Sequence, residues 1–402
     1  MTGRLYVIQE DLRSQEWVRK LFDISSNSVY LVGGIIRDAF LGKESKDVDI
    51  VVENVETDDI VDALRPFGRI QLVGQSFKVL KFRPKGHKGE DYDISVPRTD
   101  VKVGKGHRGF VTMPAKNIME DLKRRDFTVN SMAMNIASGE LVDPFDGAKD
   151  LESNLLRATD VTAFQEDPLR ILRGIQFASR LGFGIDDLTL QMMRESSPDV
   201  AEISGERIHG ELQKIVNKGG DTWLALRLIH DTDLDKTLFG RKYTLEDIPK
   251  EPLDPISFYY VLASLGGRNP EAFYTDTLSG DAVMRKDLKY LRGLWHFKGS
   301  YDAVLLHIFN TKIHSNACDA VIVPDLVRNV VRDMDDGLIP KSAKDIKVDG
   351  NTIGEELGLR GVSVGFALRD MRIDALLRLY DWKDRDATLE HLRNGLTRRT
   401  KY

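Results

Sequence analysis

The stretch LVGGIIRDAFLGKESKDVDIVV, residues 31–52, decides the fold of the first third of this chain. A β-rich apolar run ends in two glycines, a helical pattern follows from residue 35 to residue 41, and a second β-rich run closes the stretch. Further β-rich runs, KVLKF and DYDISV, alternate with a helical pattern near residues 60–64. This alternation predicts a sheet covered by helices.

The two glycines stand at the expected turn from strand to helix. Gly33 and Gly34 allow backbone N–H groups to approach a phosphate closely, and the positive end of the following helix adds attraction. Arg37, one turn further on, offers a forked pair of donors. An ordinary tight turn also produces a Gly-Gly pair, so these residues alone do not specify a phosphate site.

Two acidic residues follow on the second predicted strand. Asp47 and Asp49 alternate, so both side chains point to one face and Val48 points to the other. Two carboxylates on one face can hold Mg²⁺ ions that keep water and phosphate ligands. An isolated Asp-x-Asp is a weak signal, but its spacing from the Gly-Gly turn predicts a phosphate and metal site.

A second motif, KRRDFTVNSMAMN, precedes another apolar strand pattern. Its polar residues are Arg124, Arg125, Asp126 and Asn130. Arginine forks bind triphosphate oxygens, while the aspartate and the asparagine could orient a ribose or the local backbone. The alternative is a charged helix end that is joined to a strand by salt bridges.

The third motif, FQEDPLRILRGIQFASRLGF, has the pattern of an amphipathic helix that Gly182 ends. Leu169, Leu172, Ile175 and Ala178 follow one face, and Arg170, Arg173 and Arg180 follow another. Asp167 and Arg170 are three residues apart and can present an acceptor and a fork of donors to one base. Cytosine and adenine match that pattern, whereas uracil and guanine reverse it. The alternative makes Asp167 only a helix cap and Arg170 its surface partner.

Together these motifs resemble those of the class II tRNA nucleotidyltransferase and bacterial poly(A) polymerase family, within the DNA polymerase β-like superfamily. The resemblance implies an α+β fold: a nucleotidyltransferase head with a mixed sheet over residues 1–150, a helical neck with the nucleotide-selecting helix over 151–245, and a helical, tRNA-binding body and tail over 246–402. Residues 348–371, VDGNTIGEELGLRGVSVGFALRDM, resemble the tail segment of bacterial CCA-adding enzymes.

The same resemblance assigns roles to the motif residues. Asp47, Asp49 and Asp93 are implied as catalytic carboxylates, with Asp47 and Asp49 as ligands of Mg²⁺. The implied nucleotide-binding residues are Gly33, Gly34, Arg37, Arg125, Asp126, Asn130, Asp167, Arg170 and Arg173. Asp167 and Arg170 select CTP and ATP, and Glu166 supports them.

The implied activity is template-independent addition of CCA to the 3′ end of tRNA, with CTP, ATP and two magnesium ions, and with release of pyrophosphate. Alternatives within the family are a poly(A) polymerase or an enzyme that adds only CC or only A. Between Asp93 and Arg124, the segment TDVKVGKGHRGFVTMPAKNIMEDLK reads as a mobile basic loop. In the family that the chain resembles, enzymes that add only CC have a shortened loop here, so the resemblance favours full CCA addition. Two further alternatives are a different kind of protein. One is a metal-dependent phosphohydrolase, which the adjacent His230 and Asp231 suggest, and the other is an inactive tRNA-binding protein.

Composition sets wider limits. A length of 402 residues predicts two or more domains, and 41% hydrophobic with 30% charged residues is ordinary globular usage. Past about residue 160 the pattern is helical, with a looser zone at 241–254. The net charge of −5 gives no global attraction to nucleic acid, so local positive charge must provide it. Cys318 is the only cysteine, which excludes disulfides within the chain. Without a signal or spanning segment, a cytoplasmic location is expected. The sequence does not distinguish a monomer from a homodimer.

Overall fold

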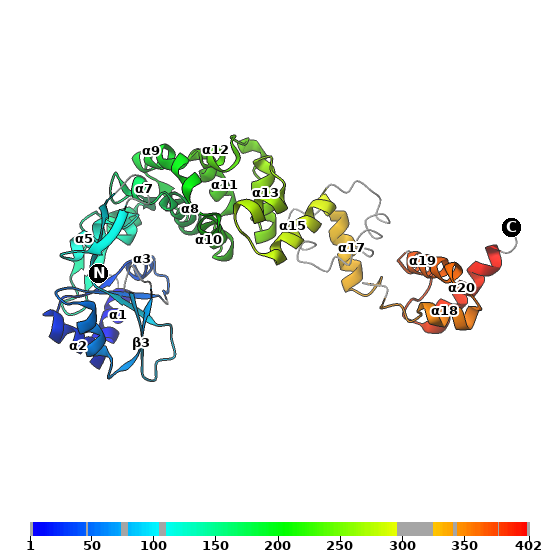
Figure 1. The fold of residues 1–402 in the computed structure, drawn as a ribbon, viewed down its shortest axis with the longest axis horizontal. Coiled ribbons are helices and arrows are strands. Elements are labelled where there is room, and N and C mark those ends of the chain that lie inside the picture. The colour runs from blue at the N-terminus through cyan, green and yellow to red at the C-terminus, as the bar shows by residue number, and fades with distance from the viewer. Residues whose placement is uncertain are drawn as a thin grey trace. The chain divides into compact units, whose positions relative to one another are not determined.

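The computed structural model describes residues 3–45, 47–73, 79–103, 110–295, 325–340, 344–376 and 378–399. It divides into two compact units, Met1–Lys250 and Glu251–Tyr402 (Figure 1). The division falls inside the segment 241–254, where the sequence pattern loosens. A split of the first unit into head and neck near residue 150 stays a prediction.

A seven-stranded sheet forms the framework of the first unit, in the order β3-β4-β5-β2-β1-β8-β9. Its strands are β1 (Val29–Val32), β2 (Val48–Val52), β3 (Gly68–Val73), β4 (Val79–Pro84), β5 (Tyr92–Ser95), β8 (Ala133–Asn135) and β9 (Leu141–Val142). β2 and β5 run parallel, whereas β1 pairs antiparallel with β2 and with β8. The sheet is therefore mixed, and the predicted α+β class is confirmed.

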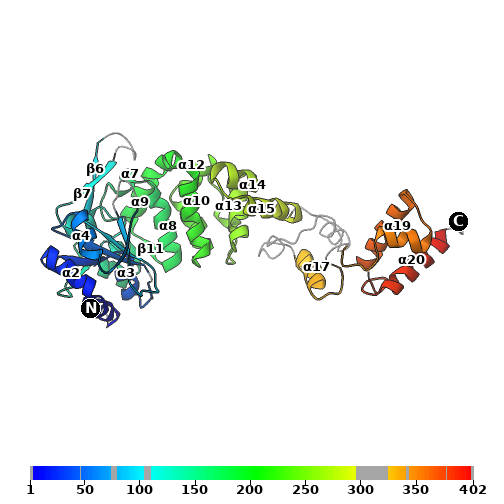
Figure 2. The same ribbon diagram turned by 60° about the horizontal axis from the view of Figure 1, so that its bottom comes forward.

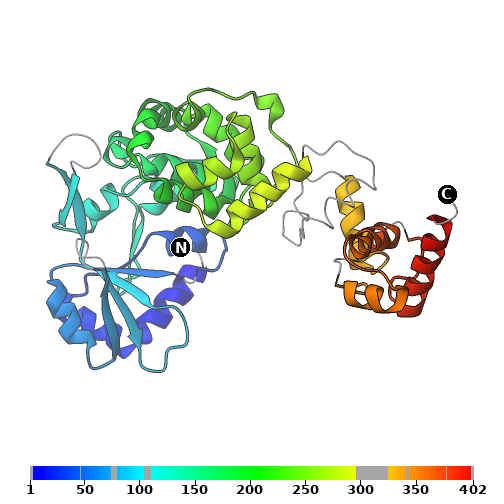
Figure 3. The same cartoon turned by 45° about the vertical axis from the view of Figure 1, so that its right-hand side comes forward.

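N-terminal helices pack on one face of this sheet (Figures 1 and 3). They include α1 (Gly3–Ser14), α2 (Glu16–Ser25) and α4 (Thr57–Leu64), and α3 (Gly34–Phe40) follows β1. Trp17 of α2 packs on Phe82 and Tyr92, with ring centroids 5.1 and 4.9 Å apart. Because side chains alternate along a strand, residues next to Phe82 and Tyr92 point to the opposite face.

The helix α5 (Ile118–Lys123) packs against that opposite face. Ile118 and Leu122 form a buried cluster with Val32, Val51 and Ala133 of the sheet. Burial of these apolar side chains fixes the end of α5 beside the turn at Gly33. The polar motif after α5 is thereby held over the centre of the sheet.

The rest of the first unit is almost wholly helical (Figure 2). Its elements are α6 (Gly147–Glu152), α7 (Ala163–Glu166), α8 (Leu169–Leu181), α9 (Asp187–Ser196), α10 (Gly205–Asn217), α11 (Thr222–Asp231) and α12 (Leu234–Phe239), with the short strands β10 (Leu155–Leu156) and β11 (Gly184–Ile185). Helix α8 lies at the centre, packed against α10 and α11. It ends at Gly182, whose φ of 72° is the left-handed conformation that favours glycine.

In the described part of the second unit, the regular elements are helices joined by turns and loops. Its helices are α13 (Pro255–Leu265), α14 (Pro270–Ala272), α15 (Ala282–Trp295), α17 (Asp325–Asp335), α18 (Gly350–Leu357), α19 (Val362–Leu376) and α20 (Arg385–Arg399). The tail-like segment at 348–371 contributes α18 and the first part of α19. In the described part of the chain, no helix is long and apolar enough to cross a membrane.

The segment between Asp93 and Arg124 differs from the sequence expectation. It is mostly regular structure: β6 (Arg98–Lys102) and β7 (Phe110–Pro114) pair antiparallel, and α5 follows. The expectation of a basic loop is therefore wrong for these strands, whose alternation of β-prone residues such as Thr99, Val101 and Val111 suits a hairpin. Residues 104–109 and Cys318 lie outside the described residues.

Candidate active site

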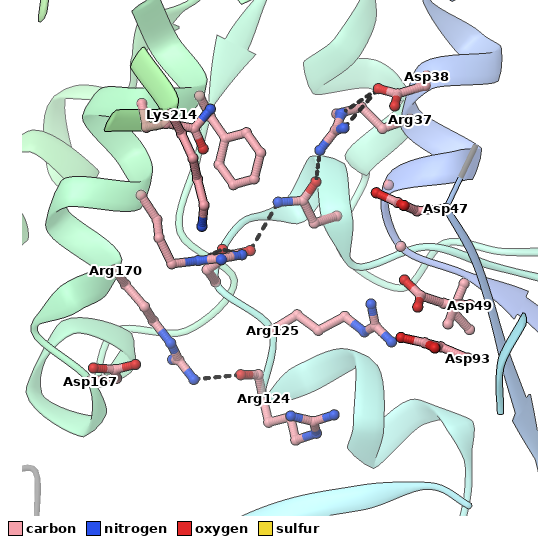
Figure 4. Close-up of a pocket in the computed structure, with 18 of the residues that line it drawn as sticks. Arg37, Asp38, Asp47, Asp49, Asp93, Arg124, Arg125, Asp167, Arg170 and Lys214 are labelled. Carbon is pink, nitrogen blue, oxygen red and sulfur yellow. Dashed lines mark hydrogen bonds and ion pairs between the residues drawn. The ribbon is translucent and has the colours of Figure 1, made fainter. Parts of the chain in front are cut away.

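One cavity of about 730 Å³ brings together every site residue that the sequence singled out (Figure 4). The motif residues that line it are Gly33, Gly34, Arg37, Asp47, Asp49, Asp93, Arg125, Asp126, Asn130, Asp167, Arg170 and Arg173. They come from the sheet, from α3, from the segment after α5 and from the start of α8. The three sequence motifs thus meet in space although they span more than a third of the chain.

Three carboxylates occupy the sheet wall of this cavity. Asp49 of β2 lies opposite Asp93 of β5 in the parallel register, and Asp47 comes directly before β2 (Figure 4). Burial and the charges of Asp93 and Asp47 raise the pKa of Asp49, although Arg125 opposes this rise. Lys81 of β4 donates to Asp93 across 2.9 Å. Negative charge is therefore concentrated at Asp47, Asp49 and Asp93, and the nearby cation of Arg125 partly offsets it.

This donor set suits a hard divalent cation only in part. Carboxylate oxygens are the ligands that Mg²⁺ prefers, and two of them leave coordination positions for water and phosphate. Among residues that the structure describes, no three His, Cys, Asp or Glu side chains converge as a metal-binding group. Asp47 and Asp49 fit a cation whose remaining ligands come from the substrate, rather than an all-protein cage.

The turn after β1 needs glycine for two reasons. Gly33 has φ of 75°, and a Cβ at this position would lie 2.8 Å from Nη1 of Arg125 and 3.6 Å from Oδ2 of Asp49. The first hydrogen bonds of α3 run from Ile36 and Arg37 to the Gly33 carbonyl. The N–H groups of Gly34 and Ile35 therefore stand outside the helical ladder, on the side of the turn.

Arg37 lines the cavity but is committed to protein acceptors. It is 6% exposed, pairs with Asp38 at 2.7 Å and donates from Nη1 to Asn130 Oδ1 at 2.7 Å. Its guanidinium also lies over the Phe177 ring, with Cζ 5.1 Å from the centroid. The free fork that the sequence suggested for Arg37 is thus largely used within the protein.

Asp126 and Asn130 continue this chain of contacts. Asn130 donates to Asp126 Oδ1 at 3.0 Å, and Asp126 Oδ2 accepts from Nε of Arg173 at 2.7 Å. Burial alone would raise the pKa of Asp126, but Arg173 and Asn130 hold it below its usual value. A buried, charged Asp126 therefore orients Arg173 of α8, a contact that the sequence did not indicate. The expected role of Asp126 and Asn130, to orient a ribose or the local backbone, stays a prediction.

Asp121 of α5 is a site residue that the sequence analysis missed. Its carboxylate is fully buried and accepts from Arg124 at 2.9 Å and from Arg125 at 3.0 Å, as well as from the backbone N–H of Arg98. Burial would raise the pKa of Asp121, but Arg125 and Arg124 lower it. The spacing of i, i+3 and i+4 on a helix was the available signal.

Asp167 and Arg170, the predicted base-selecting residues, form ion pairs with other residues and not with each other. Arg170 donates to the Ala163 carbonyl at 3.0 Å, to Glu166 at 3.2 Å and to the Arg124 carbonyl at 2.7 Å. Asp167 instead accepts from Arg207 of α10 at 3.3 Å. Both predicted selector residues line the cavity (Figure 4), and they are held by different parts of the protein.

Further lining residues come from α8 and α10 and were not predicted. They are Gln176, Phe177, Arg207, Lys214 and Lys218, and Arg180, which the sequence placed only on the arginine face of its helix. Lys214 reaches into the cavity from the side opposite the acidic wall (Figure 4). No local pattern joins α10 to the motifs, since only tertiary packing brings it to α8.

Two parts of the chain match known family models. Residues 29–157 match a family model described as the poly A polymerase head domain, and residues 182–242 match one described as a probable RNA and SrmB- binding site of polymerase A. The Multifunctional CCA protein of Xanthomonas campestris pv. campestris (strain B100) is 37% identical over 229 residues, or 55% of this chain and 53% of that protein. The chain thus spans about half the length of the curated relatives that it matches.

Solved structures agree over nearly the whole chain. The Bacillus stearothermophilus CCA-adding enzyme in complex with CTP has a TM-score of 0.70 and 22% identity, covering 96% of this chain and 99% of its own. The Thermotoga maritima CCA-adding enzyme complexed with tRNA has a TM-score of 0.66 and 21% identity, covering 98% of each chain. At this identity the likeness establishes the fold.

Proposed function

We propose that this chain, which belongs to the tRNA nucleotidyltransferase and bacterial poly(A) polymerase family, adds CCA to the 3′ end of tRNA without a template. Its substrates are tRNA, CTP and ATP. The reaction joins the RNA 3′ oxygen to the α-phosphorus of the nucleotide and releases pyrophosphate. A cytoplasmic location, where such an enzyme meets its tRNA, is part of this proposal.

The observation that carries the proposal is the shared cavity. Acidic residues on β2 and β5 line the same space as the base-selecting residues on α8. A nucleotide can therefore place its base at Asp167 and Arg170 while its phosphates lie near Asp47 and Asp49. The relatives named for CCA addition, and the solved relatives bound to CTP and to tRNA, support this choice of substrates.

The selector works through fixed side chains. With two of its donor groups held by Ala163 and Arg124, Arg170 has a set orientation, and Asp167 is restrained by Arg207. A base that offers an amino donor beside a ring acceptor can bond to both residues, as cytosine and adenine do. Uracil and guanine would place a donor against a donor of Arg170 and an acceptor against the carboxylate of Asp167, which would leave polar groups without a hydrogen bond.

Arg125 and Arg173 are assigned to the nucleotide's phosphates. Asp121 fixes the first and Asp126 the second, so each guanidinium is oriented before the substrate arrives. Orientation of this kind lowers the entropy cost of bringing reactants together. The glycine turn adds the N–H groups of Gly34 and Ile35 and leaves room for Arg125.

Magnesium is the metal that we assign to Asp47 and Asp49, with Asp93 as a further carboxylate. When bound, Mg²⁺ supplies positive charge that activates the 3′ hydroxyl and stabilises the leaving pyrophosphate. Lys81 keeps the Asp93 carboxylate in place through its 2.9 Å hydrogen bond.

The experiment is nucleotide addition to tRNA that lacks CCA. The purified chain and Mg²⁺ are supplied with CTP and ATP, singly and together, and the RNA ends are sequenced. Ends in CCA support the proposal, whereas long adenosine tracts indicate a poly(A) polymerase. Ends in CC alone, or a lone A added only to tRNA that already ends in CC, indicate a partial enzyme. Asp47→Ala should abolish extension while tRNA binding stays measurable, and wild-type turnover by this variant would refute the metal assignment.

A further inference from the structure

The helices α8 and α10 present two rows of cations to the cavity. Arg173 and Arg180 belong to α8, and Arg207, Lys214 and Lys218 belong to α10 or its end. Arg207 contacts Asp167 at the start of α8, while the N–H of Asp221, just past α10, donates to the Ser179 carbonyl near the end of α8. The two helices therefore run in the same direction, and their cations follow one another along the cavity wall.

The far end of this wall has positive charge without matching acids. Ten cationic and six acidic side chains line the cavity. Four of the acids, Asp38, Asp93, Asp126 and Asp167, pair with Arg37, Lys81, Arg173 and Arg207. Within the described ranges, no acidic side chain forms an ion pair with Arg180 or with Lys218. Burial and the neighbouring charge of Arg37 lower the pKa of Arg180, and the charge of Asp38 opposes this effect. The guanidinium still carries its positive charge at neutral pH.

Lys214 occupies the middle of the same wall. It pairs with Glu211 of its own helix at 2.8 Å, yet the amine lies inside the cavity (Figure 4). Lys214 and Lys218 are one helical turn apart, so both side chains lie on the side of α10 that lines the cavity. This arrangement stands out in a chain whose net charge is −5.

We propose that Arg180, Lys214 and Lys218 form a second phosphate-binding site, which holds the backbone of the RNA strand next to its reacting 3′ end. This inference rests on the proposed function. The nucleotide's own phosphates have Arg125, Arg173 and the glycine turn beside the acidic wall. Arg180 stands ten residues beyond Arg170, about 15 Å along the helix.

Two observations favour RNA over the nucleotide as the occupant. α10 lies inside residues 182–242, which match a model described as a probable RNA-binding site. Arg180 also stands about 15 Å along α8 from Arg170, the residue assigned to the nucleotide's base. The RNA backbone and the nucleotide both present phosphate groups, so the test must distinguish binding of RNA from binding of the nucleotide.

The test uses the full chain with Arg180→Gln, Lys218→Gln and the double variant. Two RNA probes are compared: an acceptor-stem hairpin with an unpaired 3′ end, and the same hairpin with a blunt end. Affinity is measured by fluorescence anisotropy at several salt concentrations without nucleotide. Arg241→Gln, which removes an exposed cation outside the cavity, is the matched control.

Each single variant should weaken binding of the unpaired-end probe by about three- to tenfold. It should also reduce the slope of log affinity against log salt by about 0.7, the value for one single-strand phosphate contact. The blunt probe, the control variant and the KM for CTP should stay within about twofold of wild type. Melting temperatures verify that the variants are folded.

Two outcomes overturn the inference. Unchanged binding of both probes would remove these residues from RNA contact. A raised KM for CTP, or weaker inhibition by pyrophosphate, with unchanged RNA binding would assign the site to nucleotide phosphates. Failure of the proposed function looks different, because a wild-type chain that adds no nucleotide still gives a reading in the binding assay.

Discussion

Arg170 donates a hydrogen bond of 2.7 Å from Nη2 to the backbone carbonyl of Arg124. This bond joins α8, which carries the proposed base selector, to the end of α5. From the same end of α5, Asp121 holds Arg124 and Arg125. The residue proposed to read the base and the residue proposed to hold the phosphates therefore share one framework, and a change in either should affect the other.

Replacing Arg170 with lysine should impair base choice while keeping the charge. A lysine has no planar fork and cannot bond Ala163, Glu166 and Arg124 together. Discrimination of CTP over UTP should fall by about ten- to a hundredfold, the value of one well-made base contact. Single incorporation with each of the four nucleotides measures it.

Arg194→Lys is the control for this change. Arg194 of α9 also donates to a backbone carbonyl, that of Asp231, but it lies outside the cavity. Its substitution should leave nucleotide choice as it is. Retained preference for CTP and ATP in Arg170→Lys would contradict the selector role.

Gly33→Ala should reduce nucleotide addition more than it reduces stability. The new Cβ would lie 2.8 Å from Nη1 of Arg125, the end of a flexible side chain, so Arg125 moves and leaves Asp121. We expect the KM for CTP to rise about tenfold, as for the loss of a charge-assisted hydrogen bond. Steady-state kinetics and melting temperature measure the two effects.

Gly42→Ala separates strain from contact. Gly42 has φ of 68°, close to the 75° of Gly33, but no atom lies within 4 Å of its added Cβ. Both variants meet a backbone cost for alanine at positive φ, about 1–3 kcal/mol, and this cost is larger at Gly33, whose ψ of −135° lies outside the left-handed helical region. Equal kinetics in the two variants would show that the contact with Arg125 is unimportant.

The residues that the sequence predicted are those with local signals. The Gly-Gly turn, the Asp-x-Asp strand and the arginine face of α8 each have a spacing that fixes their direction. They were placed in one cavity by the resemblance to a family, since no spacing within one motif reports on another. The same limit explains Arg207 and Lys214, which reach the cavity only because α10 packs on α8.

Other misses have different physical reasons. Phe177 lies on the arginine side of the α8 pattern, four residues after Arg173. An aromatic residue in a helix usually predicts core packing, so its contact with two arginines was not expected. The segment at 98–114 combined glycines and basic residues, which masked the strand alternation of β6 and β7. Arg37 was expected to have free donors, but its guanidinium donates to Asp38 and Asn130. Only the folded chain brings Asn130 to Arg37.

Phe177→Leu should loosen two arginines at once. Arg37 and Arg173 lie over this ring, with Cζ 5.1 and 5.4 Å from its centroid. Each cation–π contact is worth about 0.5–2 kcal/mol, so the KM for nucleotides should rise about three- to tenfold. Nucleotide titrations at saturating tRNA measure this effect.

The comparison for Phe177 is Phe164→Leu. Both rings pack on Phe127, with centroids 6.1 and 6.2 Å away, but Phe164 has no arginine over its ring in the described part of the chain. Similar losses of stability are expected from both changes. A rise in KM that is equal in the two variants would attribute the effect to core packing.

Asp121→Asn should cost stability in a pH-dependent way. The folded-state pKa of Asp121 is lowered by Arg125 and Arg124 against the effect of burial, so its stabilisation is present above the unfolded pKa of about 3.9 and is lost as the pH falls through the folded value. We expect a loss of about 1–3 kcal/mol at pH 7 that shrinks below about pH 4. Calorimetric melting at several pH values measures it, with Asp62→Asn as control, because Asp62 pairs with Arg65 at the exposed surface. A penalty that persists unchanged into acid would show that the asparagine disturbs packing rather than the ion pairs.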